Sequence, residues 1–128
     1  MSMQGNESRT RVVFNLPLNN GPQERAVIEI IGYLQDQQRK HIGIDGFTHS
    51  DKTPPVFKGW WWDFEKNEWV EDNLVMFMVD YLIPSAKKQF SLYDEIKQLK
   101  VKISEAYKRH AHAEQEVWVV SHSIVRQE

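Results

Sequence analysis

The sequence predicts a ferredoxin-like βαββαβ sandwich of the α+β class, in which two helices pack on one face of a four-stranded antiparallel sheet. The main observation is the order of patterns along the chain: strand, helix, strand, strand, helix, strand. Two βαβ halves with right-handed crossovers are typical of that fold, and its first and third strands lie in the middle of the sheet. The second observation is a run at residues 73–83 that is apolar on both faces, as expected of a central strand. A chain of 128 residues suits one domain. We expect a disordered lead-in at residues 1–10 and a single domain at 11–128.

The first strand and first helix follow from two different spacings of apolar residues. The strand is predicted at Arg11–Leu18, where Val12, Phe14 and Leu16 share one face. The helix is predicted at Pro22–Lys40, because proline costs little in a first turn and an apolar stripe follows: Val27, Ile30, Ile31 and Leu34. Residues 42–55 contain two glycines and two prolines. We therefore expect a long connection there, of the kind that is often functional or mobile.

A β-hairpin rich in aromatic residues follows, and it holds four of the chain's five tryptophans. Its strands are predicted at Val56–Phe64 and Asn73–Ile83, where aromatic and β-branched residues are concentrated. Trp60, Trp61 and Trp62 are consecutive. Since side chains alternate in a strand, Trp61 should lie on the face opposite to Trp60 and Trp62.

The last third of the chain predicts a helix and a closing strand. The helix is expected at Leu92–Ala111, where apolar residues recur at steps of three and four: Leu92, Ile96, Leu99, Ile103 and Tyr107. We expect Ile96, Leu99 and Ile103 to be buried against the sheet. The strand is predicted at Glu116–Val125 from the alternation in EVWVVSHSIV.

Composition argues against several classes of protein. Sixteen lysines and arginines stand against eighteen aspartates and glutamates, unlike the basic surface that nucleic acids require. The chain has no cysteine, which excludes disulfides and thiolate chemistry. The N-terminus lacks the apolar region of a signal peptide, and the longest apolar run, at residues 74–79, is too short to span a membrane. We expect a cytoplasmic protein that does not bind membranes. Dinucleotide, P-loop and serine-hydrolase motifs are missing, and we expect no cofactor.

Two short segments resemble the RNP sequences of RNA-recognition motifs, which share this order of elements. VVFNLPL at residues 12–18 resembles a shortened RNP2, and KGWWWDF at 58–64 resembles RNP1 with tryptophans at its aromatic positions. The resemblance implies stacking of bases on an open sheet. However, RNP1 belongs on the third strand, whereas KGWWWDF lies on the second. Together with the acidic charge balance, this predicts no nucleic-acid partner.

The five histidines do not form a metal-binding pattern. His110 and His112 are two residues apart on a predicted helix, which places them on different faces. His49 and Asp51 lie in the long connection without a paired motif such as HExxH. We expect no metal site, and we interpret the histidines as surface or capping groups.

Asp80 and His122 are the candidates for catalysis. Asp80 falls between Met78 and Leu82 on one face of the predicted central strand, and His122 lies on the last strand near Trp118. A carboxylate among apolar neighbours has a raised pKa, and a His–Asp pair can act as acid and base. This pattern is the basis of an alternative hypothesis, a cofactor-independent enzyme for small molecules. The competing interpretation of Asp80 is a partly solvated charge at the end of a strand.

The leading hypothesis is a domain that acts by association. With the helices on one face of the sheet, the apolar residues of the other face need a cover. A homodimer packed through this face provides one, and a small apolar or aromatic ligand near the tryptophans is a second expected partner. The alternative cover is the 42–55 connection. The ligand or interface residues predicted by this hypothesis are Trp60, Trp61, Trp62, Met76, Met78 and Trp118.

Overall fold

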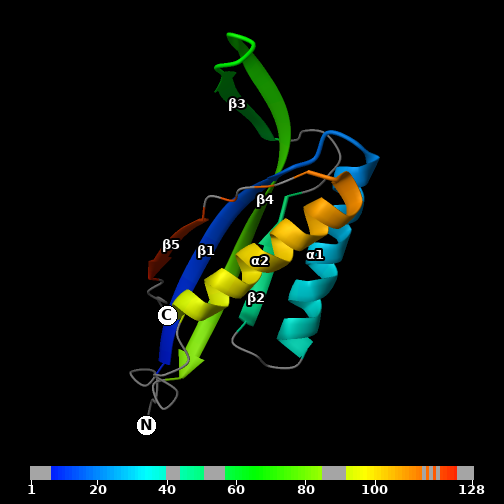
Figure 1. Ribbon diagram of the computed structural model, residues 1–128. Coiled ribbons are helices and arrows are strands. Elements are labelled where there is room, and N and C mark those ends of the chain that lie inside the picture. Colours follow the sequence, from blue (N-terminus) through cyan, green and yellow to red (C-terminus); the bar gives the residue numbers. More distant parts are fainter. Residues whose placement is uncertain are drawn as a thin grey trace.

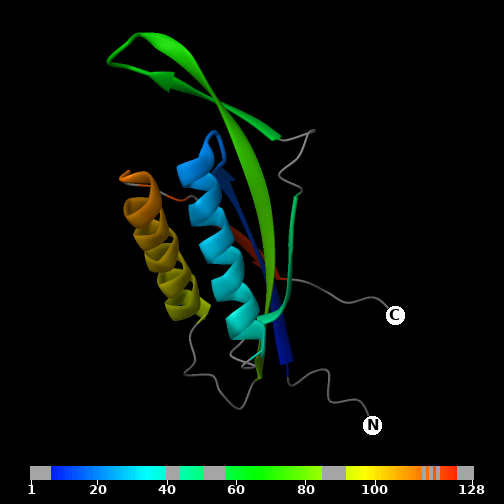
Figure 2. The same ribbon diagram turned by 90° about the vertical axis from the view of Figure 1, so that its right-hand side faces the viewer.

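The computed structural model describes residues 7–39, 44–50, 57–84, 92–113, 115, 117 and 119–123. In chain order the elements are β1 (Glu7–Pro17), α1 (Gly21–Arg39), β2 (Ile44–His49), β3 (Phe57–Asp63), β4 (Glu68–Pro84), α2 (Leu92–Ala111) and β5 (Val119–Ser123). Figures 1 and 2 show two layers, with both helices covering the same face of one sheet. The predicted ferredoxin-like α+β sandwich is confirmed, with five strands in its sheet rather than four.

The sheet is antiparallel and runs in the order β2-β4-β1-β5, with β3 also paired to β4. The two strands predicted to be central, β1 and β4, are the central ones. They pair along the whole of β1, from Glu7 opposite Pro84 to Pro17 opposite Leu74. β5 lies on the far side of β1, so β1 has a neighbour on each edge.

The prediction of a long connection at residues 42–55 was wrong, because β2 forms within it. Ile44–His49 pairs with β4 opposite Phe77–Tyr81 and extends the sheet at its edge, so these residues do not cover the open face. A bulge between Ile44 and Gly46 explains why the strand was missed. The extra residue lets Ile44 and Phe47, three positions apart, both pack on the core, which breaks the usual alternation. Residues 51–56 lie outside the described part of the chain.

Other boundaries differ by a few residues. β1 begins at Glu7, inside the predicted disordered lead-in, because the long β4 offers backbone partners as far as Pro84 even to polar residues. Residues 1–6 are outside the described part. β4 starts at Glu68 rather than Asn73, and β5 is observed at Val119–Ser123, within the predicted span, of which residues 116, 118, 124 and 125 lie outside the described part. α1 is displaced by one residue at each end, and α2 spans Leu92–Ala111 as predicted.

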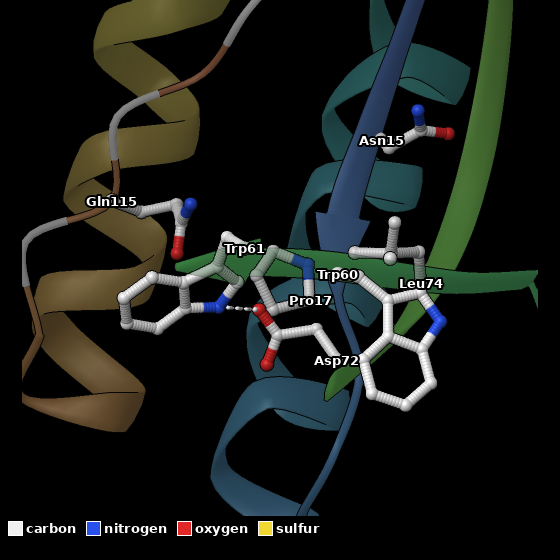
Figure 3. A pocket seen from close by; sticks show the side chains of 8 residues that line it. Asn15, Pro17, Trp60, Trp61, Asp72, Leu74 and Gln115 are labelled. Carbon is white, nitrogen blue, oxygen red and sulfur yellow. Dashed lines mark hydrogen bonds between the residues drawn. The ribbon is translucent and has the colours of Figure 1, made fainter. Parts of the chain in front are cut away.

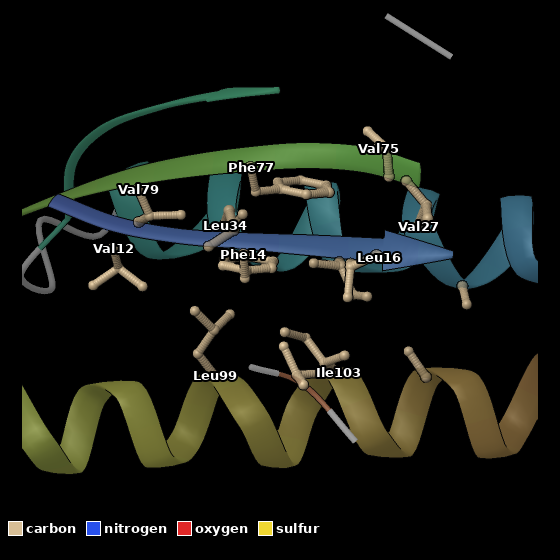
Figure 4. Packing of buried hydrophobic residues seen from close by; sticks show 14 of the residues in the cluster. Val12, Phe14, Leu16, Val27, Leu34, Val75, Phe77, Val79, Leu99 and Ile103 are labelled. Carbon is tan, nitrogen blue, oxygen red and sulfur yellow. The ribbon is translucent and has the colours of Figure 1, made fainter. Parts of the chain in front are cut away.

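The hydrophobic core lies between the sheet and the two helices (Figure 4). Strand residues of alternating position face the helices and have at most 1% of their surface exposed: Val12, Phe14, Leu16, Val75, Phe77, Val79 and Tyr81. The rings of Phe14 and Phe77 stack with centroids 5.1 Å apart. From α2, Leu99 and Ile103 point towards β1 and are fully buried, as predicted. Ile96, which was also predicted to be buried, packs against the core but is only partly buried. The apolar residues that recur at regular spacing along the helices and strands therefore form one core.

Charged and polar contacts join the helices at the edge of this core. The Glu29 carboxylate of α1 contacts three side chains of α2, namely the cations Lys102 at 3.2 Å and Arg109 at 2.6 Å and the His110 ring at 3.0 Å. Burial raises the pKa of Glu29, but hydrogen bonds from these neighbours outweigh burial and lower the pKa to about 2. This cluster anchors α2 to α1 on the side away from the sheet core.

Two further groups mark the ends of α2. Near its start, Glu95 is 4% exposed, and burial raises the pKa of its carboxyl, with a smaller contribution from Asp94. Near its end, the Tyr107 hydroxyl donates a 2.6 Å hydrogen bond to the carbonyl of Pro17. Burial raises the pKa of Tyr107, so this hydroxyl keeps its proton as a donor.

In the described segments, neither helix contains an apolar stretch long enough to cross a bilayer.

Candidate functional site

The aromatic hairpin projects from the two-layer body as an arm, shown in green in Figures 1 and 2. We define the arm as residues 57–74, that is β3, the turn at residues 64–67 and the first part of β4. Its strands pair from Phe57 opposite Leu74 to Asp63 opposite Glu68. Figure 2 shows that the arm bends towards the side of the helices. Both layers of the body end before the arm does, so most of its surface has no cover from the body.

The turn of the arm is formed by polar residues suited to it. The Asp63 carboxylate accepts hydrogen bonds from the backbone N–H groups of Glu65 and Lys66, at 2.9 and 3.1 Å. Asn67 has a φ of 55°, a left-handed conformation that asparagine tolerates better than most residues. These contacts fix the register in which the tryptophans face one another.

One face of the arm, which we call the aromatic face, carries Lys58, Trp60, Trp62, Trp69 and Glu71. Trp62 and Trp69 are cross-strand partners whose rings meet edge to face, with centroids 5.4 Å apart. Trp60 and Trp69 are 62% and 64% exposed, and Phe64 at the tip is 86% exposed. Lys58 and Glu71 form an ion pair of 2.7 Å beside them. The aromatic face therefore combines large exposed rings with one charge of each sign.

Trp61 lies on the opposite face of the arm, which confirms the prediction about the three consecutive tryptophans. Its indole N–H donates to Asp72 Oδ2 at 2.9 Å. The other carboxylate oxygen of Asp72 accepts from the Asn19 side chain at 3.1 Å, and the Asn19 amide oxygen accepts from the Asn73 backbone at 2.8 Å. Asn19 follows β1, so these bonds tie the base of the arm to the body.

A pocket of about 290 Å³ opens where the arm leaves the body (Figure 3). It is lined by Asn15, Pro17, Gly59, Trp60, Trp61, Asp72, Leu74 and Gln115. In the view of Figure 3 the indoles of Trp61 and Trp60 lie on either side of the Asp72 carboxylate. Gly59 lets Leu74 pack directly over it, since a Cβ there would lie 2.6 Å from a Leu74 methyl. The part of the chain that the structure describes contributes no lysine or arginine to this lining.

The open face of the main sheet is a second exposed surface, and it is only partly apolar. Met76 and Met78 lie on this face and are half-buried, while Val120 is 65% exposed. The register places Met78 opposite Val13, and Val13 opposite Val120, in one row. Charged and polar groups interrupt the surface next to this row. This face is therefore less apolar than the arm.

The structure does not bring the two catalytic candidates together. Arg11 of β1 lies opposite Asp80 on one side and opposite His122 on the other. Two strand spacings therefore separate the backbones of Asp80 and His122, roughly 10 Å. The Arg11 guanidinium binds both oxygens of the Asp80 carboxylate, at 2.8 and 3.1 Å. The side chain of His122 lies outside the described part of the structure. Asp80 is thus held by an ion pair on a half-exposed surface, and the geometry adds no support to the catalytic hypothesis.

The histidines that the structure describes are not among the residues that line the pocket. Trp118 and His41 are not among the described residues. His49 lies near the ring of Phe77, with centroids 5.7 Å apart, and His110 belongs to the Glu29 cluster. Among the described residues, no group of three or more His, Asp or Glu side chains is placed to hold a metal ion.

Asp72 is the residue whose role the sequence did not reveal. The acidic residues around the turn suggest a solvated rim, which describes the exposed Glu65, Glu68 and Glu71 but not Asp72. Asp72 lies opposite Gly59, one pair away from Trp61 on the same face. If the cross-strand pairs of the hairpin had been counted outward from the turn, they would have placed the Asp72 carboxylate beside the Trp61 indole.

Comparisons with known proteins find no family and only distantly similar structures. No family model matches the sequence. No curated protein matches it either. CutA1 from Oryza sativa aligns over 94% of this chain and 84% of its own, with 10% identity and a TM-score of 0.49. A hydroxynitrile lyase from Passiflora edulis aligns over 96% of this chain and 98% of its own, with 15% identity and a TM-score of 0.44. A dimeric ferredoxin-like protein of unknown function from Jannaschia sp. CCS1 aligns over 91% and 99%, with 11% identity and a TM-score of 0.46. Similarity this low carries no argument about activity or assembly.

Proposed function

We propose that this protein acts by association, as a homodimer whose contact surface is the aromatic face of the arm together with Phe64 at its tip. The observation that carries the proposal is the exposure of Trp60, Trp69 and Phe64, which ranges from 62% to 86%. Large exposed apolar patches on folded proteins mark sites of interaction. Covering one such indole would contribute roughly 2–3 kcal/mol from apolar burial.

The position of these rings favours a partner from outside the chain. A two-stranded hairpin is at best marginally stable in water unless a third strand or a packed layer supports it. The arm projects past the helices and the main sheet, so its outer part receives little support from the body (Figure 2). A second layer packed on the aromatic face would supply that support.

A second copy of the chain suits this face because the face is self-complementary. Its centre is apolar, and its charged pair, Lys58 and Glu71, presents one cation and one anion. A two-fold axis brings the same patch of both protomers together, so each apolar centre meets an apolar centre. Either charged group can then meet its opposite on the other protomer.

The size of the arm sets the expected affinity of the dimer. Its paired strands are seven residues long, or about 23 Å. Two strands of that length present a footprint of a few hundred Å², below the roughly 800 Å² per partner of a standard interface. We therefore expect a reversible dimer with a dissociation constant on the order of micromolar.

Light scattering after size-exclusion chromatography, over a range of protein concentrations, tests the proposal. The mass should rise from that of the 15.2 kDa chain towards twice that value as concentration increases. The double variant Phe64→Ser/Trp69→Ser should remain monomeric. Tyr93→Ser is the matched control, because Tyr93 is 72% exposed but lies on α2. A wild-type chain that stays monomeric at high concentration would refute the proposal.

The same assay distinguishes the arm from the open sheet face. Val120→Lys places a charge in the apolar row of that face, where Val120 is 65% exposed. If dimerisation uses the arm, this variant should dimerise as the wild type does. Loss of the dimer in Val120→Lys, with the arm variant unaffected, would transfer the interface to the sheet face.

A further inference from the structure

The pocket at the base of the arm has the composition of a binding site for a positively charged ligand. Two indoles, from Trp60 and Trp61, and the apolar side chains of Pro17 and Leu74 surround one carboxylate, that of Asp72. The other polar lining groups are the uncharged amides of Asn15 and Gln115. Among the described residues that line this pocket, the single formal charge is therefore negative.

The Asp72 carboxylate is fixed in position but not neutralised. It accepts one hydrogen bond from the Trp61 indole and one from the Asn19 amide, each to a different oxygen. Both donors are uncharged, and a carboxylate has about four acceptor sites. Within the described part of the chain, no lysine, arginine or histidine forms an ion pair with Asp72. The carboxylate is thus oriented by its neighbours and retains acceptor capacity for a ligand.

The indoles favour the same kind of ligand. Tryptophan is the strongest aromatic partner for a cation, and attraction to its ring face increases when both groups are partly removed from water. Trp60 is 62% exposed and Trp61 is 47% exposed, so a ligand would find ring surface available at the mouth of the pocket. A volume of about 290 Å³ is at the small end of the range for ligand sites.

We propose that this pocket binds a small organic cation, namely an ammonium group attached to a compact apolar or aromatic body. The ammonium donates to the Asp72 carboxylate, and the apolar body lies against Trp60, Trp61 and Leu74. A carboxylate or phosphate ligand would meet the Asp72 charge without a cation on the wall to balance it. A neutral ligand would leave that charge without a partner.

This site shares Trp60 with the proposed dimer surface, but its carboxylate and its other indole lie outside that surface. Trp61 and Asp72 lie on the face of the arm opposite to Trp62 and Trp69. A protomer packed on the aromatic face would leave the Trp61 side available. The binding experiment can therefore be run on the monomeric Phe64→Ser/Trp69→Ser variant as well as on the wild type.

Isothermal titration calorimetry with 2-phenylethylammonium as the probe tests the proposal, with 2-phenylethanol as its neutral counterpart. We expect the ammonium to bind with a dissociation constant on the order of 1 mM, as suits a ligand this small. The alcohol should bind at least about tenfold more weakly. Added salt should weaken binding of the ammonium but not of the alcohol, because salt screens charge–charge attraction.

Two amide variants test whether the Asp72 carboxylate is the charge that binds the ammonium. Asp72→Asn keeps an oxygen that can accept from Trp61 but removes the charge, so it should weaken ammonium binding about tenfold. Glu65→Gln is the matched control, since it removes an exposed carboxylate in the turn of the arm, which is not among the residues lining the pocket, and should leave binding unchanged. Circular dichroism of each variant confirms that it is folded. If Asp72→Asn fails to fold, the wild-type preference for ammonium over alcohol still decides the matter.

Three results would overturn the proposal: equal affinity for the ammonium and the alcohol, equal losses in the two amide variants, or no heat of binding at 20 mM probe. A monomeric protein that binds the ammonium would refute the dimer alone. A dimer that does not bind it would refute the cation site alone.

Discussion

Replacing Glu29 with glutamine should destabilise the protein at neutral pH and have little effect in acid. The Glu29 carboxylate holds Lys102, Arg109 and His110 of α2, and its pKa is lowered to about 2 despite partial burial. An unfolded glutamate has a pKa of about 4.3. The folded state therefore gains stability from this group above pH 4.3, and the gain is lost as the pH falls towards 2.

The expected magnitude follows from the pKa and the exposure of the groups. A shift of about two pKa units corresponds to roughly 3 kcal/mol if no screening occurs. However, the side chains of Glu29 and Arg109 are 24% and 53% exposed, so water and salt weaken the pair. We expect Glu29→Gln to lower the free energy of unfolding by about 1–2 kcal/mol at pH 7.

Urea denaturation followed by circular dichroism, at pH 7, 4 and 2.5, measures this effect. The difference between the wild type and Glu29→Gln should be largest at pH 7 and should shrink steadily through the acid range. Glu65→Gln is the control, because Glu65 is an exposed glutamate in the turn of the arm, outside both helices. A difference that stays constant with pH would show that the glutamine variant fails for steric reasons and that the ion cluster contributes nothing.

Three further changes test the core and the ends of α2. Leu99→Ala should lower the free energy of unfolding, measured in urea, by about 2–5 kcal/mol, because Leu99 is fully buried. The control Val101→Ala, at a half-exposed position of the same helix, should lower it by under about 1 kcal/mol. A loss below about 0.5 kcal/mol for Leu99→Ala would contradict the core assignment. Glu95→Gln should stabilise the protein at pH 7 and not at pH 4. Burial raises the pKa of Glu95, so the folded state is penalised for this charge only above the pKa of the unfolded state. Equal denaturation midpoints for the variant and the wild type at pH 7 would contradict this. Tyr107→Phe should cost about 0.5–1.5 kcal/mol through loss of the bond to Pro17, measured by thermal unfolding, and an unchanged midpoint would argue against that bond.

The sequence by itself determined the class of fold, the two central strands and the buried face of each helix. The bounds of α2 and the burial of Leu99 and Ile103 were predicted from steps of three and four residues. The separation of Trp61 from Trp60 and Trp62 followed from the alternation of a strand. These features depend on local geometry, because the period of side chains in a helix or strand is set by the backbone of that element alone.

Tertiary structure decided which groups meet across the sheet. The bulge in β2 shifted its apolar residues out of alternation, so no local pattern marked that strand. Arg11 lies between Asp80 and His122 because the register of β1 against two neighbours places it there. Asp72 faces Trp61 only because the hairpin pairs in one register and not the next. Register depends on turns, bulges and packing between segments distant in the chain, and a shift of one residue moves every side chain of a strand to the other face. The chemistry of the pocket therefore became visible only when the strands were paired.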